Sequence, residues 1–140
     1  IHIYENNLVY LDEGQYLYTF DILLNEFSLF KQKINSSSSN IFFNNSLILK
    51  NGNYLQSINI KNGKTFWLIE NDDISKKNNI IAVRNYNSNI EIYLDNGDVL
   101  LLNNKKLIEI NSLGVSNISS LIFKDNNIIA KTVSGLTVIF

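Results

Sequence analysis

Few side chains in this sequence are of the types that carry out catalysis or bind metals. His2 is the only histidine, and the chain has no cysteine. Zinc sites in proteins are built from several imidazole and thiolate ligands, so a lone imidazole cannot form one. We therefore expect His2 to be an ordinary strand residue, and we predict no metal site.

Carboxylates could provide acid–base catalysis as a pair, or they could bind calcium. The candidates are Asp72, Asp73, Glu91, Asp95 and Asp98. They do not follow the spacing that places the oxygen ligands of an EF-hand calcium loop. They fall in predicted turns and on one predicted strand, and we expect them to be solvated surface residues rather than a catalytic pair.

The run from Ser36 to Ser39 offers hydroxyl groups without a visible base. A serine becomes a nucleophile when a neighbouring group takes its proton, and no histidine lies near this run in the sequence. We expect the run to be a loop between two structural units. The sequence thus predicts no catalytic residue and no cofactor-binding residue.

The composition narrows the remaining classes of function. The 140 residues have a net charge of −1, and the lysines and arginines are scattered along the chain. Nucleic acids and anionic membrane surfaces attract proteins with a basic stripe, so neither is an expected direct partner. An apolar content of 45% with 18% charged residues is typical of a folded domain.

The two ends of the sequence carry little information on cellular location. The chain begins at Ile1 without an initiator methionine and ends in the apolar run Leu136–Phe140. We expect both ends to be cuts in a longer protein, so that a missing signal sequence leaves the compartment open. No run approaches the roughly 18 apolar residues of a membrane helix.

The pattern of apolar residues predicts strands joined by hairpins. Short runs of Ile, Leu, Val, Phe and Tyr recur between clusters of Asn, Gly, Asp and Ser. Asn51-Gly52, Asn62-Gly63 and Asn96-Gly97 lie between such runs, and Asn-Gly supplies the positive φ angles of tight hairpin turns. The stretch 21–30 comes nearest to a helix, but it fits two strands broken at Asn25-Glu26 equally well.

A repeat organises these strands. Gly14, Gly52, Gly97 and Gly135 begin similar phrases that lie 38, 45 and 38 residues apart. A period near 40 with four short strands has the size of a β-propeller blade. We therefore predict an all-β fold, a β-propeller fragment of about three and a half four-stranded antiparallel blades. The expected blades span roughly residues 1–35, 36–74, 75–115 and, incomplete, 116–140.

The same runs place the individual strands. The first unit predicts strands at Ile1–Tyr4, Leu8–Leu11, Tyr16–Leu23 and Phe27–Ile34. The second predicts Ile41–Phe43, Leu47–Lys50, Tyr54–Ile60 and Thr65–Glu70. The third predicts Ile80–Val83, Ile90–Leu94, Val99–Asn103 and Leu107–Ile110. The last predicts Leu121–Lys124, Asn127–Thr132 and Leu136–Phe140, without a fourth strand.

The segment from Ser57 to Trp67 resembles the tryptophan-docking repeat of pyrroloquinoline-quinone (PQQ) type propellers. That repeat has a small residue, an Asp two positions later, then Thr-Gly, and a Trp four positions after the Gly. Gly63 and Trp67 match, while Ser57 replaces Ala, Asn59 replaces Asp and Asn62 replaces Thr. The other units are degenerate: the first has Phe27 or Phe30 where a Trp could fall, and the third has no aromatic after Lys105-Lys106.

Each residue of this repeat motif has a structural role. Asn59 can cap the turn that follows the third strand, and Gly63 permits a left-handed backbone. Trp67 is expected to pack against a neighbouring blade. The tyrosines could join it in the core between blades or form an aromatic recognition surface, and the core is the favoured alternative. These tyrosines are Tyr16, Tyr18, Tyr54 and Tyr93.

The resemblance implies a function as well as a fold. It extends to the BamB family, propeller lipoproteins of the outer-membrane β-barrel assembly machinery, which bind protein partners through loops at one face and need no cofactor. It implies a non-catalytic scaffold in the periplasm or at the outer membrane, with membrane contact only through a partner or a lipid anchor outside this chain. The degenerate repeats and the absence of an adjacent Cys pair favour this reading.

Two other readings remain. A PQQ-dependent dehydrogenase would need a catalytic Asp, calcium ligands and stacking aromatics outside this stretch. A propeller with an unrelated partner is also possible, although the chain has no Trp-Asp blade endings. If the scaffold reading holds, the longest polar connections are the expected contact regions. These are Asp72–Asn79, which includes Lys76-Lys77, and Arg84–Asn89.

Overall fold

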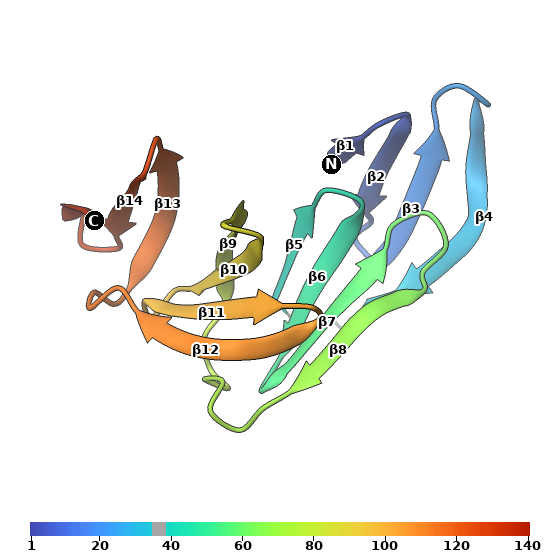
Figure 1. The fold of residues 1–140 in the computed structure, drawn as a ribbon. Helices are drawn as coiled ribbons and strands as arrows, with labels where there is room; N and C mark the ends of the chain where they lie inside the picture. Colours follow the sequence, from blue (N-terminus) through green and yellow to red (C-terminus); the bar gives the residue numbers. More distant parts are fainter. Residues whose placement is uncertain (35–38) are drawn as a thin grey trace.

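The computed structural model describes residues 1–34 and 39–140, and the side chains of these residues except 28–30. The described chain forms four antiparallel sheets that follow one another along the sequence (Figure 1). The first sheet contains β1 (His2–Tyr4), β2 (Asn7–Leu11), β3 (Tyr16–Asp21) and β4 (Glu26–Lys33). The second contains β5 (Ser39–Phe43), β6 (Ser46–Asn51), β7 (Tyr54–Asn59) and β8 (Thr65–Glu70).

The remaining two sheets repeat the same order. The third contains β9 (Ile80–Tyr86), β10 (Asn89–Leu94), β11 (Asp98–Asn103) and β12 (Lys106–Ser112). The fourth has three strands, β13 (Ile118–Lys124), β14 (Asn127–Thr132) and β15 (Thr137–Ile139). Each strand pairs with the next one in the sequence, as expected for strands joined by hairpins. No described segment forms a helix that is long and apolar enough to cross a membrane.

The sheets are arranged like the blades of a propeller. The first strands of the second, third and fourth sheets, β5, β9 and β13, lie against one another, while the later strands fan outward (Figure 1). Three apolar cores fill the spaces between successive sheets. They join the first sheet to the second, the second to the third, and the third to the fourth. The predicted all-β propeller fold is therefore confirmed.

Strand β6 contains consecutive apolar residues rather than apolar residues that alternate with polar ones. The five residues from Ser46 to Lys50 are all buried, because this strand is covered on both faces. Alternate side chains of a strand point to opposite faces, so Leu47 and Leu49 enter the core shared with the first sheet. Ile48 enters the core shared with the third sheet.

Several hairpin turns depend on left-handed residues other than glycine. In the three predicted Asn-Gly turns only the glycines have positive φ, with values of 61°, 70° and 91° for Gly52, Gly63 and Gly97. Two other turns, Asn87-Ser88 and Asn104-Lys105, have positive φ at both central residues, as a type I′ hairpin requires.

Gly97 is required for a second reason besides its backbone angle. A Cβ at this position would lie 2.0 Å from the carbonyl oxygen of Val115, in the connection between β12 and β13. The Gly97 carbonyl also accepts a hydrogen bond from the backbone N–H of Leu113 at 2.9 Å. The β10–β11 turn and the connection to the fourth sheet are therefore held together by direct backbone contact.

Candidate interaction surfaces

The repeat motif holds the outer hairpin of the second sheet. The Asn59 side-chain oxygen accepts a hydrogen bond from the Lys61 backbone N–H at 2.8 Å, and Gly63 N–H donates to the Asn59 carbonyl at 2.9 Å. Trp67 lies directly opposite Ser57 in the β7–β8 ladder, and both side chains are buried. The indole belongs to the core between the second and third sheets. All four residues are thus engaged in the structure of the hairpin.

The turn expected at Asn25-Glu26 in the first sheet has the same capping design, which was not predicted from the sequence. In the first sheet, the Asp21 carboxylate accepts hydrogen bonds from the backbone N–H groups of Leu23 at 2.9 Å and Leu24 at 3.0 Å. Asn25 has a φ of 53° and lies four residues after Asp21, as Gly63 lies four residues after Asn59. A search for a carboxylate or amide followed four residues later by Asn or Gly would have found both turns.

Phe27 of the first outer hairpin does not take the role of Trp67. Phe27 is more than half exposed, and its ring meets Phe20 edge-on at a centroid distance of 5.1 Å. The other stand-in considered for tryptophan, Phe30, has a side chain outside the described part of the structure. The first sheet therefore exposes Phe27 at the start of its outer strand, in contact with the partly buried Phe20 of β3.

His2 and Ser39 connect neighbouring sheets. The His2 Nε2 atom lies 2.7 Å from the Asn44 carbonyl oxygen, and its ring stacks on Phe42. Ser39 accepts a hydrogen bond from the Ile80 backbone N–H at 2.9 Å. The expected loop at Ser36–Ser39 is wrong for Ser39, which lies in β5 because its backbone pairs with Lys50. Residues 36–38 lie outside the described residues.

The candidate carboxylates mainly organise turns. Asp95 accepts hydrogen bonds from the side-chain amide of Asn78 at 2.6 Å, and Asp98 accepts one from Asn96 at 2.7 Å. Asp72 accepts one from Asn53 at 3.0 Å. In residues 1–34 and 39–140, no three histidine or acidic side chains gather into a group that could hold a metal ion. Asp73 extends the same polar turn and is exposed.

Glu91 belongs to a compact ionic and aromatic cluster between the third and fourth sheets. Its carboxylate lies 2.6 Å from Arg84 Nε and accepts a hydrogen bond from the Tyr93 hydroxyl. The Arg84 guanidinium lies 4.7 Å from the centroid of the Phe123 ring on β13. Burial, together with the bond to Glu91, raises the pKa of the Tyr93 phenol. This cluster fixes the fourth sheet against the third.

The position of Arg84 in this cluster shows that one expected loop was largely wrong. The predicted polar connection Arg84–Asn89 is mostly strand, because Arg84 lies in β9 directly opposite Glu91 in β10. A charged residue can occupy this position because its partner faces it across the ladder at the edge of a core. Only Asn87 and Ser88 form the turn.

The tyrosines divide between core and surface. Tyr93 is fully buried in the core between the third and fourth sheets. Tyr16 and Tyr18 are partly buried on the first sheet, where the Lys31 ammonium lies 4.2 Å and 5.3 Å from their ring centroids. Tyr54 is exposed. Of the aromatics considered for recognition, Trp67 and Tyr93 are therefore core residues, while the other three reach the surface.

The expected connection Asp72–Asn79 is a loop between the second and third sheets. Its backbone is anchored by the buried side chain of Ile74 and by a hydrogen bond from Asp95 N–H to the Asn79 carbonyl at 3.0 Å. Lys76 and Lys77 remain exposed at its outside. The loop thus presents charged side chains on a fixed backbone, which is the form that a recognition loop takes.

A buried lysine lies close to this loop. The Lys50 ammonium donates a hydrogen bond to the Gly52 carbonyl at 2.7 Å, and only 3% of the residue is exposed. Burial lowers the pKa of this ammonium, and the Asp95 carboxylate acts in the opposite direction. The same carboxylate binds Asn78, so it links the loop to the second sheet electrostatically.

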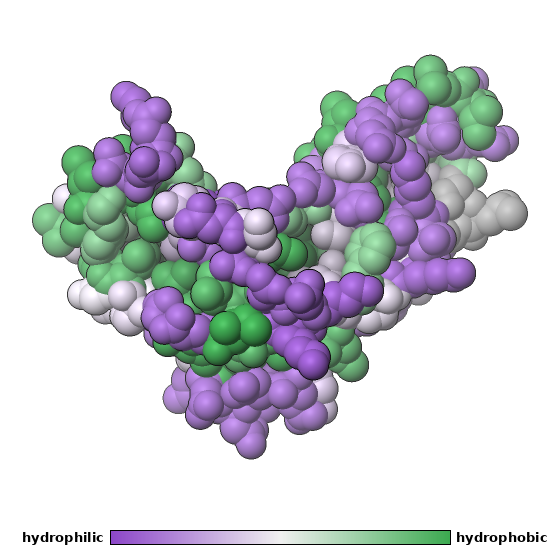
Figure 2. All heavy atoms as spheres, in the orientation of Figure 1, coloured by the Kyte–Doolittle hydropathy of each residue, from purple (hydrophilic) through white to green (hydrophobic). Residues whose placement is uncertain are grey.

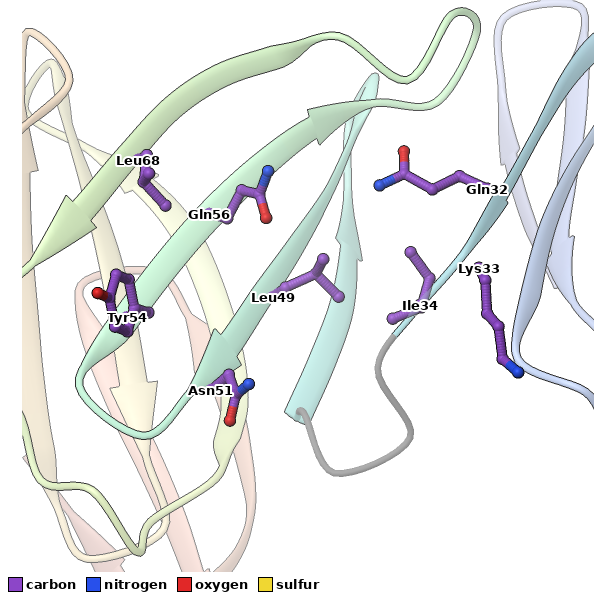
Figure 3. A pocket seen from close by; sticks show the side chains of 8 residues that line it. All are labelled: Gln32, Lys33, Ile34, Leu49, Asn51, Tyr54, Gln56 and Leu68. Atoms are coloured by element: carbon purple, nitrogen blue, oxygen red, sulfur yellow. The ribbon is translucent and has the colours of Figure 1, made fainter.

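A pocket of about 320 Å³ lies between β4 and the second sheet (Figure 3). Gln32, Lys33 and Ile34 form one wall, and Leu49, Gln56 and Leu68 form much of the other. Tyr54 and Asn51 lie at one end. The lining combines amides, one ammonium and apolar side chains, which can bind polar groups without supplying a nucleophile and its base.

Comparisons by sequence and by structure give different results. No family model and no curated protein matches the sequence. Solved structures do match, with 99% of this chain aligned to BamB from Moraxella catarrhalis at a TM-score of 0.68 and 17% identity. The chain spans 41% of that BamB chain. The expected resemblance to BamB is thus present in the fold.

Two other solved propeller-like structures give similar values. The computationally designed Ika4 protein aligns at a TM-score of 0.67 and 16% identity, covering 99% of this chain and 86% of Ika4. BBS1N, in complex with ARL6DN, aligns at a TM-score of 0.65 and 16% identity, covering 95% of this chain and 42% of BBS1N. The TM-scores demonstrate a shared fold, and at identities this low the likeness extends to the fold alone.

Proposed function

We propose that this chain is part of a non-catalytic β-propeller scaffold that binds protein partners through the loops between its sheets. The anchored loop Asp72–Asn79 carries the proposal, because it exposes Lys76 and Lys77 on a backbone that is already fixed. A fixed loop loses little conformational entropy on binding. The complex of BBS1N with ARL6DN supports the idea that this fold can present protein-binding surfaces.

The finer proposal places this scaffold in outer-membrane protein assembly, in the periplasm or at the outer membrane. The likeness to BamB supports it, together with the motif at Ser57–Trp67. Depletion of the full-length protein should then lower the amount of folded outer-membrane β-barrels in its host. Unchanged β-barrel levels would count against this role but would not contradict the proposal that the propeller binds protein partners.

Site-specific photo-cross-linking tests the binding loop directly. A photoreactive residue in place of Lys76 in the full-length protein should cross-link to a discrete partner, which mass spectrometry identifies. The same residue in place of the exposed Lys131 on β14 provides a control on the fourth sheet, away from the loop. Equal cross-linking from both positions, or none from Lys76, would contradict the assignment of this loop.

Calorimetric titration separates the scaffold from the dehydrogenase alternative. Titrating PQQ and calcium into the folded full-length protein should release no heat of binding. Micromolar or tighter binding of PQQ in the presence of calcium would instead establish a quinoprotein. The test uses the full-length protein because the chain covers less than half of the BamB chain that it resembles.

A further inference from the structure

The turn between β3 and β4 exposes two leucines at the end of the first sheet. Leu23 is 74% exposed and Leu24 is 67% exposed, and together they are called the apolar tip here. Figure 2 shows hydrophobic residues gathered at the upper right end of the molecule, where Figure 1 places the β3–β4 turn. Large apolar side chains exposed side by side are typical of a contact surface.

The fold does not require apolar residues at the tip. The equivalent turn of the second sheet has the same capping bond and a left-handed residue at the same place, yet it carries Lys61 and Asn62. Ile22 is 49% exposed, although its counterpart Ile60 is a buried core residue between sheets. Leu23 and Leu24 therefore lack a structural role that polar residues could not fill.

The backbone of the tip is held in place. The Asp21 carboxylate binds both leucine N–H groups, and the Ile22 N–H donates to the Asn6 carbonyl at 2.8 Å. These bonds fix the turn to its own strand and to the β1–β2 turn. A partner that binds the tip need not order it first, which favours association.

A groove of about 240 Å³ lies beside the tip and continues toward the equivalent turn of the second sheet. Leu24 lines it together with the carboxylates of Asp21 and Glu26. Lys61 also lines the groove, and its ammonium lies 3.1 Å from the Glu5 carboxylate. With two carboxylates and one ammonium among its lining residues, the groove has a net negative charge beside the apolar side chains of Leu24 and Phe27.

We infer that the apolar tip and this groove bind an extended segment of a partner protein that carries apolar side chains beside lysine or arginine. The leucines would contact the apolar side chains, and Asp21 and Glu26 would attract the cation. An anionic membrane is a poorer occupant, because the same carboxylates would approach lipid phosphates. The inference rests on the proposed scaffold function and names the chemistry of one partner.

Selection from a phage-displayed library of random dodecapeptides tests the inference with the full-length protein as bait. Enriched peptides should combine leucine-like and basic residues. The double variant Leu23→Gln/Leu24→Asn should bind the synthetic form of the best peptide about tenfold more weakly or worse, because two apolar contacts are lost. Thermal melting of the variant should match that of the wild-type chain, which shows that its fold is intact.

A matched control removes exposed apolar residues from another turn. Val133 and Leu136 flank the β14–β15 turn and are 75% and 58% exposed. The variant Val133→Asn/Leu136→Gln should bind the peptide as tightly as the wild-type chain. Equal losses in both double variants would show non-specific hydrophobic binding and would overturn the inference.

The remaining outcomes also give clear answers. Peptides that bind the wild-type chain and the Leu23→Gln/Leu24→Asn variant equally well would overturn the tip as the site, while protein binding by the scaffold would stand. Failure to enrich any peptide would overturn the tip as a peptide-docking site; the cross-linking experiment at Lys76 judges the scaffold separately. Binding to vesicles of phosphatidylglycerol that is lost in the tip variant, without peptide binding, would identify a membrane as the occupant instead.

Discussion

The turns that follow β3 and β7 share one backbone design and differ in the side chains that they display. In each, a side-chain oxygen at the end of the strand caps the turn, Asp21 in the first and Asn59 in the second. In each, a left-handed residue follows four positions later. The two middle residues of each turn, Leu23-Leu24 and Lys61-Asn62, differ, since the shared capping bonds are donated by backbone N–H groups. Asn62 also accepts a side-chain hydrogen bond from the Lys64 N–H at 3.0 Å. The second sheet displays polar residues there, and the first displays leucines.

The two outer strands that these turns introduce also differ. Trp67 on β8 is buried between the second and third sheets, whereas Phe27 on β4 is 57% exposed. Trp67 thus fastens one hairpin into a core, whereas Phe27 does not do so for the other. This difference is consistent with two roles. The outer hairpin of the second sheet stabilises the propeller, and the outer hairpin of the first sheet presents its turn to a partner.

The largest expected effect on stability concerns the aromatic residues of the two outer strands. Trp67→Ala should lower the free energy of unfolding by about 3–5 kcal/mol, because it empties a large site in a closed core. Phe27→Ala should cost less than about 1 kcal/mol, since most of the ring already faces solvent. Urea denaturation followed by circular dichroism measures both. Similar losses of unfolding free energy in the two variants would contradict these two roles.

The next largest losses of stability are expected at the two capping residues. Asp21→Ala removes two hydrogen bonds to a charged acceptor and should cost about 2 kcal/mol, while Asn59→Ala removes a neutral one and should cost about 1 kcal/mol. Asp21→Asn is the control, because an amide oxygen can still accept a bond, as Asn59 does. Urea denaturation at neutral pH gives the values. A larger cost for Asn59→Ala would contradict the role assigned to the carboxylate.

Exchanging the left-handed residues should give smaller changes of opposite sign. Asn25→Gly should stabilise by up to about 0.5 kcal/mol, because glycine tolerates a positive φ without strain. Gly63→Asn should destabilise by about 0.5–1 kcal/mol at its φ of 70°. Differential scanning calorimetry resolves shifts of this size. Two changes of the same sign would show that the two turns are not equivalent.

The smallest effect on stability is expected at the apolar tip. Leu23→Gln/Leu24→Asn should change the free energy of unfolding by less than about 0.5 kcal/mol, because both side chains face solvent and all capping bonds come from the backbone. Equilibrium unfolding in urea provides the test. A loss of 2 kcal/mol or so, the scale of burying a leucine, would mean that the leucines serve the fold.

The sequence predicted the strands well where turn residues mark both ends. Thr65–Glu70 and Asn127–Thr132 were placed without error, since clusters of Asn, Asp, Gly and Ser isolate these runs. The prediction failed for Arg84, which was assigned to a loop. Its place in a strand depends on Glu91 across the ladder, and a pairing between two strands cannot be read from one run of residues.

The candidate surfaces were only partly visible in the sequence. The loop Asp72–Asn79 was predicted from its length and polarity, and it lies where expected. A break at Asn25-Glu26 was predicted, but the cap at Asp21 was missed because the search for turn motifs relied on glycine, whereas Asn25 provides the left-handed residue there. The exposure of Leu23 and Leu24 was also hidden, because consecutive leucines in a sequence indicate a core more often than a surface.

The contact between Gly97 and Val115 bears on how such a protein diverges. It joins main-chain atoms and therefore does not depend on which apolar side chains fill the core nearby. Substitutions can accumulate in that core while the path of the chain from the third sheet into the fourth is preserved, provided that residue 97 stays glycine. In a fold recognisable at 17% identity, this glycine would be among the last positions to change.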